Sequence, residues 1–168
     1  LVKLLKISGK SIRMDSKLIG SNIARQSRYE LIHSTLVKFL KGNVLDRLPD
    51  DMRLQAEAYL KEDSTKTVYR SDSDTLQSRL QAIGDFTHAI LQQYHAESSN
   101  YGLLKRVFDE QYLTGEDGKV VLRDKKTISA NSVQNPNDPD ASYREKHDQK
   151  VQGYVSNCTE TLEEKDEE

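Results

Sequence analysis

The sequence has very little of several features that commonly identify a protein class. Its single cysteine, Cys158, excludes an internal disulfide and a zinc site built from several cysteines. No apolar run is long enough to cross a bilayer, and residues 1–10 lack both the apolar stretch and the small-residue cleavage site of a secretory signal. We therefore expect a protein of the reducing cytoplasm that has no membrane partner.

Motifs that carry chemistry are also scarce. No glycine-rich phosphate loop occurs, and the histidines do not stand at a metal-binding spacing, so we expect them on the surface. These histidines are His33, His88, His95 and His147. Asp138 and Asp140 lack the glycine and the glutamate of a calcium loop, and we expect them to form Asx-type turns beside the neighbouring prolines.

Composition and charge suit one soluble domain. Charged residues make up 31% of the 168 residues and hydrophobic residues 35%. Residues 1–28 contain seven Lys or Arg and one Asp, whereas residues 159–168 contain six acidic residues and one Lys. The basic start can contact phosphate, and an acidic run of this kind usually stays solvated.

Hydrophobic periodicity predicts a strand, a helical block and a second strand. Residues 11–15 alternate like a half-buried strand, with Asp15 at its exit, and residues 150–161 alternate again. Ser21 is the expected N-cap of the first helix, and we expect a further strand in 127–133. The predicted helices cover about 22–41, 49–61, 73–97 and the segment from Asn100 to 112.

Two segments together resemble the DDE transposases of bacterial insertion sequences. The first is IRMDSKLIGSNIARQSRYELIH, residues 12–33. The second is NPNDPDASYREKHDQKVQGYVSNCTET, residues 135–161, with its DPDA turn, its Tyr-Arg pair and a GY strand that ends in a T-E-T step. Their order, with a helical block between them, makes the match more specific than either motif alone.

The resemblance implies an α+β fold: an incomplete ribonuclease H-like core with a short antiparallel sheet and a large helical insertion at about 22–112. In that family three carboxylates bind two Mg²⁺ ions for DNA strand cleavage and joining, and Asp15 matches the first, as a catalytic residue and metal ligand. The family's second Asp and final Glu lie downstream of the GY strand. We therefore expect residues 1–168 to be a partial catalytic domain that is inactive alone.

The resemblance also implies partners: DNA at transposon ends, and further copies of the chain in a complete protein. Positive residues near both motifs are candidate phosphate contacts, against the alternative that they are ordinary solvated surface. The candidate DNA-binding residues are Lys10, Arg13, Lys17, Tyr143, Arg144, Lys146 and Lys150. Gln26 and Cys158 stand where we would expect an aromatic and an aliphatic residue, which hints at a decayed copy.

Three other interpretations stay open. Asp15 can be a helix N-cap or a turn residue, as many Asp residues at strand–helix junctions are. The helical block can be a non-catalytic interaction module. The chain can also be another nuclease on a ribonuclease H-like core. The transposase interpretation predicts that the strand of Asp15 pairs with the strand at 150–160, with the helices inserted between them, and that the Asp15 side chain is exposed.

Overall fold

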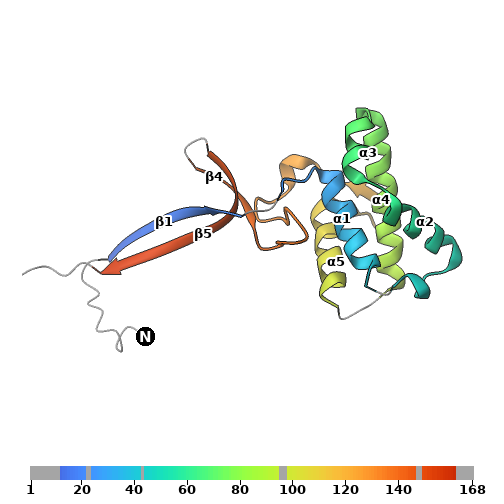
Figure 1. The fold of residues 1–168 in the computed structure, drawn as a ribbon, viewed down its shortest axis with the longest axis horizontal. Helices are drawn as coiled ribbons and strands as arrows, with labels where there is room; N and C mark the ends of the chain where they lie inside the picture. The colour runs from blue at the N-terminus through green and yellow to red at the C-terminus, as the bar shows by residue number, and fades with distance from the viewer. Residues whose placement is uncertain (1–11, 22–23, 43, 95–97, 147–148, 162–168) are drawn as a thin grey trace, which may run out of the picture.

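The computed structural model describes residues 12–21, 24–42, 44–94, 98–146 and 149–161. These residues form a mixed α+β structure, as predicted (Figure 1). The helices are α1 (Arg28–Leu40), α2 (Asp50–Lys61), α3 (Ser64–Arg70), α4 (Ser73–Gln93) and α5 (Ser99–Gln111). The strands are β1 (Ile12–Gly20), β2 (Tyr112–Thr114), β3 (Val120–Leu122), β4 (Ser142–Lys146) and β5 (Gln149–Thr161). None of the described helices is long and apolar enough to span a membrane.

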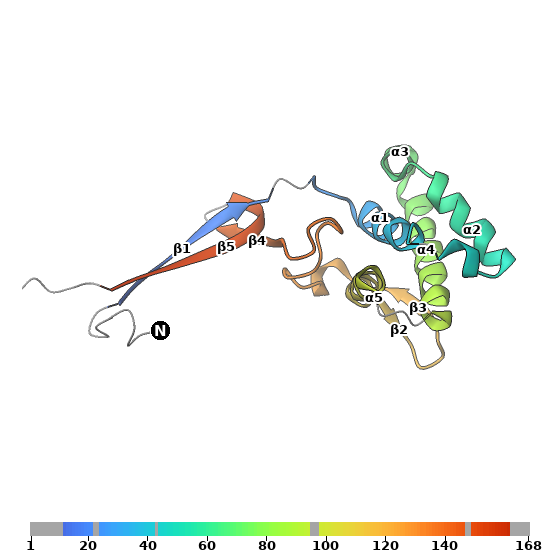
Figure 2. The ribbon, with the colours of Figure 1, turned by 60° about the horizontal axis from the view of Figure 1, so that its bottom comes forward.

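The predicted pairing of the two motif strands is confirmed. β1 runs antiparallel to β5 along its whole length, and β4 pairs with the other edge of β5, giving the order β1-β5-β4. Asp15 lies inside β1 and not at its exit, because the strand continues for five residues to Gly20. Figures 1 and 2 show this three-stranded sheet extending away from the helices.

The prediction of a strand in 127–133 is wrong. A 3-10 turn at Lys125–Thr127 follows β3, and irregular backbone then leads to β4, which supplies the third strand instead. Local hydrogen bonds account for the difference: the Asp124 carboxylate accepts from the N–H of Lys126, and Ser132 N–H donates to Ser129 O. Backbone N–H groups that donate within a turn are not available for hydrogen bonds to a neighbouring strand.

Caps explain where the helix predictions fail. α1 begins at Arg28 and not near 22, because Ser27 and Glu30 form a capping box. α4 is capped by Asp72 rather than by Ser71 and Asp74. α3 was not predicted at all; it has only seven residues, too few for a clear apolar stripe. The prediction of α2 is confirmed to within a residue.

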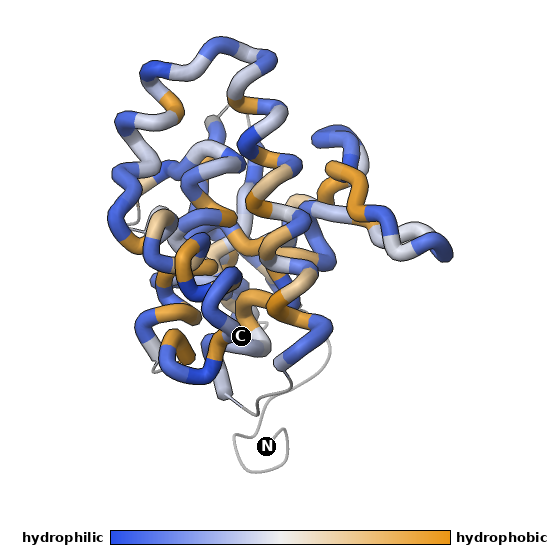
Figure 3. Tube along the Cα trace, turned by 90° about the vertical axis from the view of Figure 1, so that its right-hand side faces the viewer, coloured by the Kyte–Doolittle hydropathy of each residue, from blue (hydrophilic) through white to orange (hydrophobic). Residues whose placement is uncertain are grey.

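The hydrophobic core lies among the helices. Leu36, Ile83 and Ile90 are completely buried, and hydrophobic and hydrophilic residues interchange along the helices as in amphipathic segments (Figure 3). His33 is also buried, which contradicts its predicted place on the surface. Its Nε2–H donates to Tyr59 O at 3.0 Å, and burial lowers the pKa of the imidazole below its ordinary value.

The helical unit, residues 24–122, is therefore distinct from the three-stranded sheet. The core cluster takes its buried members from α1, α2, α4 and α5, the β2–β3 hairpin and the loops at Leu48 and Val133, while α3 only packs Val68 against it. The cluster includes no described residue of β1, β4 or β5. The helices are inserted between the paired strands in chain order, as predicted, but they do not cover the sheet. The loop at 128–141 connects the two parts.

Candidate functional site

Asp15 occupies an open position on β1, directly opposite Cys158 of β5. Its side chain is exposed, which confirms the predicted exposure. Oδ1 accepts a hydrogen bond of 2.8 Å from the backbone N–H of Ser16, and Asp15 forms no ion pair with any described residue. The interpretation as a helix N-cap is wrong because the residue is inside a strand.

The strand register sets the neighbours of Asp15. Side chains of an antiparallel pair alternate between the two faces, so Asp15 shares its face with Arg13 on β1 and with Cys158 and Glu160 on β5. These four residues line a pocket of about 280 Å³. Cys158, the single cysteine, is exposed there. We call this surface of the sheet the Asp15 face.

The described residues do not by themselves fit the two Mg²⁺ ions that the resemblance implies. Asp15 and Glu160 are the carboxylates of the pocket, and Arg13 adds a positive charge beside them. Across the described ranges, no group of three or more His, Cys, Asp or Glu lies close enough to hold a metal ion. A two-metal centre needs more oxygen ligands than these two side chains offer.

The register divides the candidate DNA-binding residues between two faces. Tyr143 and Lys150 share the Asp15 face with Arg13 and Lys17, because Tyr143 pairs with Gln152 and Lys150 with Glu145. Arg144 belongs to the opposite face, and its Nη2 donates to Asn131 Oδ1 at 2.6 Å.

The side chains of two further candidates lie outside the described part of the structure. Lys146 lies at the end of β4, and only its backbone is described. Lys10 lies outside the described residues.

The charge on the Asp15 face is mixed. Its three cations are Arg13, Lys17 and Lys150, and they are spread along the sheet. Lys17 pairs with Ser156, which lies six positions from Lys150 along β5, a distance of about 20 Å. Three carboxylates lie among them, and these are Asp15, Glu145 and Glu160. Electrostatic attraction for a phosphate backbone is therefore local to each cation and not a property of the whole face.

A carboxylate that sequence reasoning misjudged joins the sheet to the loop. Asp138 accepts hydrogen bonds from Ser21 Oγ at 2.5 Å and from the Tyr154 hydroxyl, and these bonds lower the pKa of its carboxyl group. The Asx-type turn beside it is made by Asn135, whose Oδ1 accepts from the N–H of Asn137 at 2.9 Å. The expectation that Asp138 and Asp140 make such turns is not met, since the Asp138 side chain is bound across the junction.

Gly153 gives a physical reason for the GY motif. A Cβ atom at this position would collide with the backbone of β1, at Ile19 O and Ser21 N. Only glycine permits this close approach of the two strands. Tyr154, the next residue, reaches Asp138. The motif thus fixes the place where β5, β1 and the loop meet.

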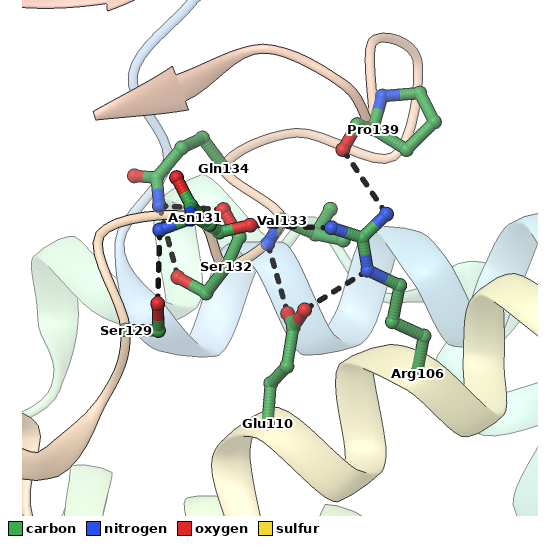
Figure 4. Close-up of polar contacts among 8 residues, drawn as sticks. All are labelled: Arg106, Glu110, Ser129, Asn131, Ser132, Val133, Gln134 and Pro139. Carbon is green, nitrogen blue, oxygen red and sulfur yellow. Dashed lines mark hydrogen bonds and ion pairs between the residues drawn. The ribbon is translucent and has the colours of Figure 1, made fainter. Parts of the chain in front are cut away.

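The helical unit holds the loop through α5 (Figure 4). Glu110 Oε2 accepts from the N–H of Val133 at 2.8 Å, while Glu110 Oε1 pairs with Arg106 Nε at 2.9 Å. Arg106 also donates to the carbonyl oxygens of Asn131 and Pro139. Val133 itself is completely buried in the helical core. The Arg106–Glu110 pair is local to α5, but the bonds to the loop join residues at least 23 positions apart, so no local signal predicted them.

A second pocket, of about 300 Å³, was also missed by sequence reasoning. It lies between α1, α5 and the loop, and Arg28 and Lys125 bring positive charge to it. Arg28 Nε donates to Gln111 Oε1 at 2.8 Å, and partial burial lowers the pKa of the guanidinium. The sequence places Arg28 simply at the start of a helix, with no sign of the pocket.

Comparison with known proteins identifies no relative. No protein-family model matches the chain, no curated protein is similar to it, and no solved structure shares its fold at a significant level. The functional interpretation consequently rests on the motif strands, the Asp15 face and the chemistry of their residues.

Proposed function

We propose that the chain is part of the catalytic domain of a DDE-type transposase that acts on DNA. In this proposal β1 and β5 belong to a ribonuclease H-like core, and Asp15 is the first carboxylate of the catalytic set. The observation that carries the proposal is the antiparallel pairing of β1 with β5, across more than a hundred residues of intervening chain. The resemblance requires these two segments to be neighbours, and local sequence does not force them together.

The chemistry of Asp15 supports the same proposal. A carboxylate that is exposed and free of ion pairs with described residues can accept a ligand without first breaking a strong contact. The backbone N–H of Ser16 holds one of its oxygens, which fixes the orientation of the group. Arg13 and Lys17, two residues away on either side, can contact DNA phosphates next to it.

The proposal includes weak metal binding and no cleavage by these residues alone. Mg²⁺ gives up its hydration water reluctantly and usually takes one or two carboxylates together with substrate phosphates. Asp15 alone should therefore bind it with a dissociation constant on the order of millimolar. Chemistry should be absent, since a catalytic set that acts as a unit loses most of its rate when members are missing.

Manganese relaxation tests the role of Asp15. We expect Mn²⁺, added to the chain bound to duplex DNA, to broaden amide NMR signals mainly at residues 13–17 and 158–160. Asp15→Asn should abolish the broadening, whereas Asp117→Asn, in the exposed turn between β2 and β3, should not. Broadening that survives Asp15→Asn would contradict the assignment of this carboxylate.

A nicking and strand-transfer assay tests the expected inactivity. With Mg²⁺ or Mn²⁺ and insertion-sequence ends, the chain should give no product. Product that disappears in Asp15→Ala would mean that further carboxylates, such as Asp138, Asp140 or the acidic run at 159–168, complete the set within these residues.

A non-catalytic interaction module remains the second candidate, and one observation favours it. The helical unit has its own core, yet Leu54 on α2 and Tyr69 on α3 are 73% and 90% exposed. Exposed apolar side chains of this size can contact a protein partner. Loss of DNA binding on mutation of the sheet would favour the transposase proposal, because the module interpretation gives the sheet no role.

A further inference from the structure

Two arginines and a lysine lie near the end of α5 without an acidic partner. Arg28 begins α1, and Arg123 and Lys125 follow β3. Arg28 and Arg123 are half-buried, yet none of the three forms an ion pair with any described residue. Cations that are withdrawn from water are usually paired with an acidic group. Their position therefore suggests an anion that is not part of the chain.

Neutral acceptors hold the two guanidinium groups in place. Arg28 Nε donates to Gln111 Oε1 at 2.8 Å, and its Nη2 donates to Gln111 O at 2.6 Å. Arg123 Nη2 donates to Asp109 O at 3.1 Å. The two carbonyl oxygens belong to the last turn of α5, where the helix dipole supplies only about half a negative charge. These bonds orient the cations and neutralise them only in part.

All three cations line one pocket, of about 340 Å³, beside the start of α4. We call it the α4 pocket. Asp124 is the one carboxylate among the described residues that line it, and its Oδ1 already accepts from the N–H of Lys126 at 2.9 Å. Three cations and one carboxylate leave the lining with two positive charges. Arg123 Nε is buried and has no described acceptor, so part of the desolvation of this guanidinium is not offset by a hydrogen bond.

The pocket of about 300 Å³ between α1, α5 and the loop shares Arg28 and Lys125 with the α4 pocket. We call it the loop pocket. No carboxylate lines it among the described residues; Leu31 and Val133 give it apolar surface, and Gln134 adds an amide. Apolar walls with a few polar groups are typical of pockets that bind small organic molecules. The shared cations therefore join a charged pocket to one suited to an organic group.

We propose that the two pockets form one binding site for a small organic phosphate. The phosphate group would contact Arg28, Arg123 and Lys125, and the organic group would occupy the loop pocket. A phosphate monoester carries close to two negative charges at neutral pH, which match the net charge of the lining. Its oxygens suit the planar donor fork of arginine, and Nη1 of Arg28 donates to no described residue. The inference concerns residues outside the Asp15 face, so it does not depend on the proposed function.

An NMR titration tests the site with two ligands of known chemistry. Inorganic phosphate should shift the Nε–H signals of Arg28 and Arg123, with a dissociation constant on the order of millimolar. Adenosine monophosphate should shift the same signals and also the amides of 129–134, and it should bind more tightly because it fills the loop pocket as well. Adenosine, which has no charge, should bind at least about tenfold more weakly than its monophosphate.

Charge reversal identifies the cations that act. Lys125→Glu should weaken the binding of adenosine monophosphate at least about tenfold, since it replaces an attraction with a repulsion. Lys125 is exposed and has no side-chain contact with a described residue, so this variant should remain folded. Lys126→Glu is the matched control, because the next residue changes the charge equally and lines neither pocket. Circular dichroism checks both variants.

DNA is the other source of phosphate groups, and a binding assay with duplex DNA separates it. The two variants should bind the duplex equally if the site takes a small molecule. Loss of duplex affinity in Lys125→Glu alone would overturn the inference and assign these cations to a DNA backbone.

Three further results would overturn it. The first is an absence of shifts at Arg28 and Arg123 with either phosphate ligand. The second is an equal loss of affinity in Lys125→Glu and Lys126→Glu. The third is adenosine monophosphate that binds no better than inorganic phosphate, which would remove the role of the loop pocket. Each result leaves the Asp15 face untouched, so it is distinguishable from a failure of the proposed function.

Discussion

The helical unit and the three-stranded sheet differ most in what they bury. In the helical unit Leu36, Ile83 and Ile90 are fully buried, whereas the only buried residue described in β1, β4 and β5 is Gly153. Burial of apolar area is the main favourable contribution to folding. The helices therefore provide most of the stability of this chain, while the sheet exposes charged, polar and apolar side chains alike, Met14 among the last.

Because of this difference, we expect the helical unit to determine stability and the sheet to determine binding. A substitution in the helical core should unfold the chain, and one on the Asp15 face should leave the fold intact and change what binds there. The loop at 128–141 is the exception, since it contacts both α5 and the sheet.

Removing a core side chain should have the largest effect. Ile83→Ala leaves a cavity in a fully buried site and should lower the free energy of unfolding by about 2–5 kcal/mol. Met14→Ala, on the exposed edge of the sheet, should change it by less than about 0.5 kcal/mol. Urea unfolding followed by circular dichroism measures both. Similar losses in the two variants would contradict the division.

Detaching the loop should have an intermediate effect. Glu110→Ala removes the acceptor of the Val133 N–H and the partner of Arg106, and should destabilise the chain by about 1–3 kcal/mol. Glu116→Ala, in the exposed turn between β2 and β3, is the matched control. If both variants melt at the same temperature, the loop is not held as Figure 4 shows.

The pH dependence of stability should have a contribution from His33. Burial lowers the pKa of this imidazole in the folded chain, so the unfolded chain takes up the proton first. Stability should consequently fall as pH drops below about 6.5, the ordinary pKa of histidine. His33→Gln should flatten the curve between pH 5 and 7. An unchanged curve would show that other groups determine it.

Two carboxyl groups should affect stability in a lower pH range than His33 does. Burial opposes ionisation of Glu30, but the hydrogen bonds that its carboxylate accepts from Ser27 and Thr65 lower its pKa in the folded chain. The bonds that Asp138 accepts from Ser21 and Tyr154 lower the pKa of that carboxyl group in the same way. Their stabilisation is present above the ordinary carboxyl pKa and is lost as pH falls through the folded-state values. The two windows can therefore be separated in one titration.

Disturbing the junction of β1 and β5 should have the smallest effect on global stability. Gly153→Val forces a side chain against Ile19 O and Ser21 N, so the strands must separate there. Amide exchange in β1 should become faster, while the unfolding midpoint of the helices stays nearly constant. A large drop in that midpoint would mean that sheet and helices unfold as one unit.

The sequence predicted those features that depend on local pattern. The alternation around Asp15 and around Gly153 predicted two strands, and the resemblance predicted that they pair. The sequence did not predict the start of α1, because Ser27 with Glu30 caps the helix better than Ser21 does. Nor did it predict β4 or the loop, whose bonds to Arg106 and Glu110 join distant residues.

Only part of the candidate site could be predicted from the sequence, for a similar reason. Alternation along a strand separates neighbours such as Tyr143 and Arg144, but this becomes apparent only when the strand boundaries are known. The role of Asp138 depends on Ser21 and Tyr154, which are distant in sequence, so its spacing to other residues carries no signal of it.

DNA binding by the Asp15 face is the most direct test of the account. Fluorescence anisotropy with a labelled duplex should be measured across a salt series for two triple alanine variants that remove equal charge. The sheet variant changes Arg13, Lys17 and Lys150, and the control changes the exposed helical-unit residues Lys41, Arg47 and Arg70.

We predict that the sheet variant loses about tenfold or more in affinity. The slope of log affinity against log salt should fall by about 0.9 for each phosphate contact removed, while the control keeps both values. Equal losses in the two variants, or a loss only in the control, would contradict the proposal that the sheet carries the DNA-binding function.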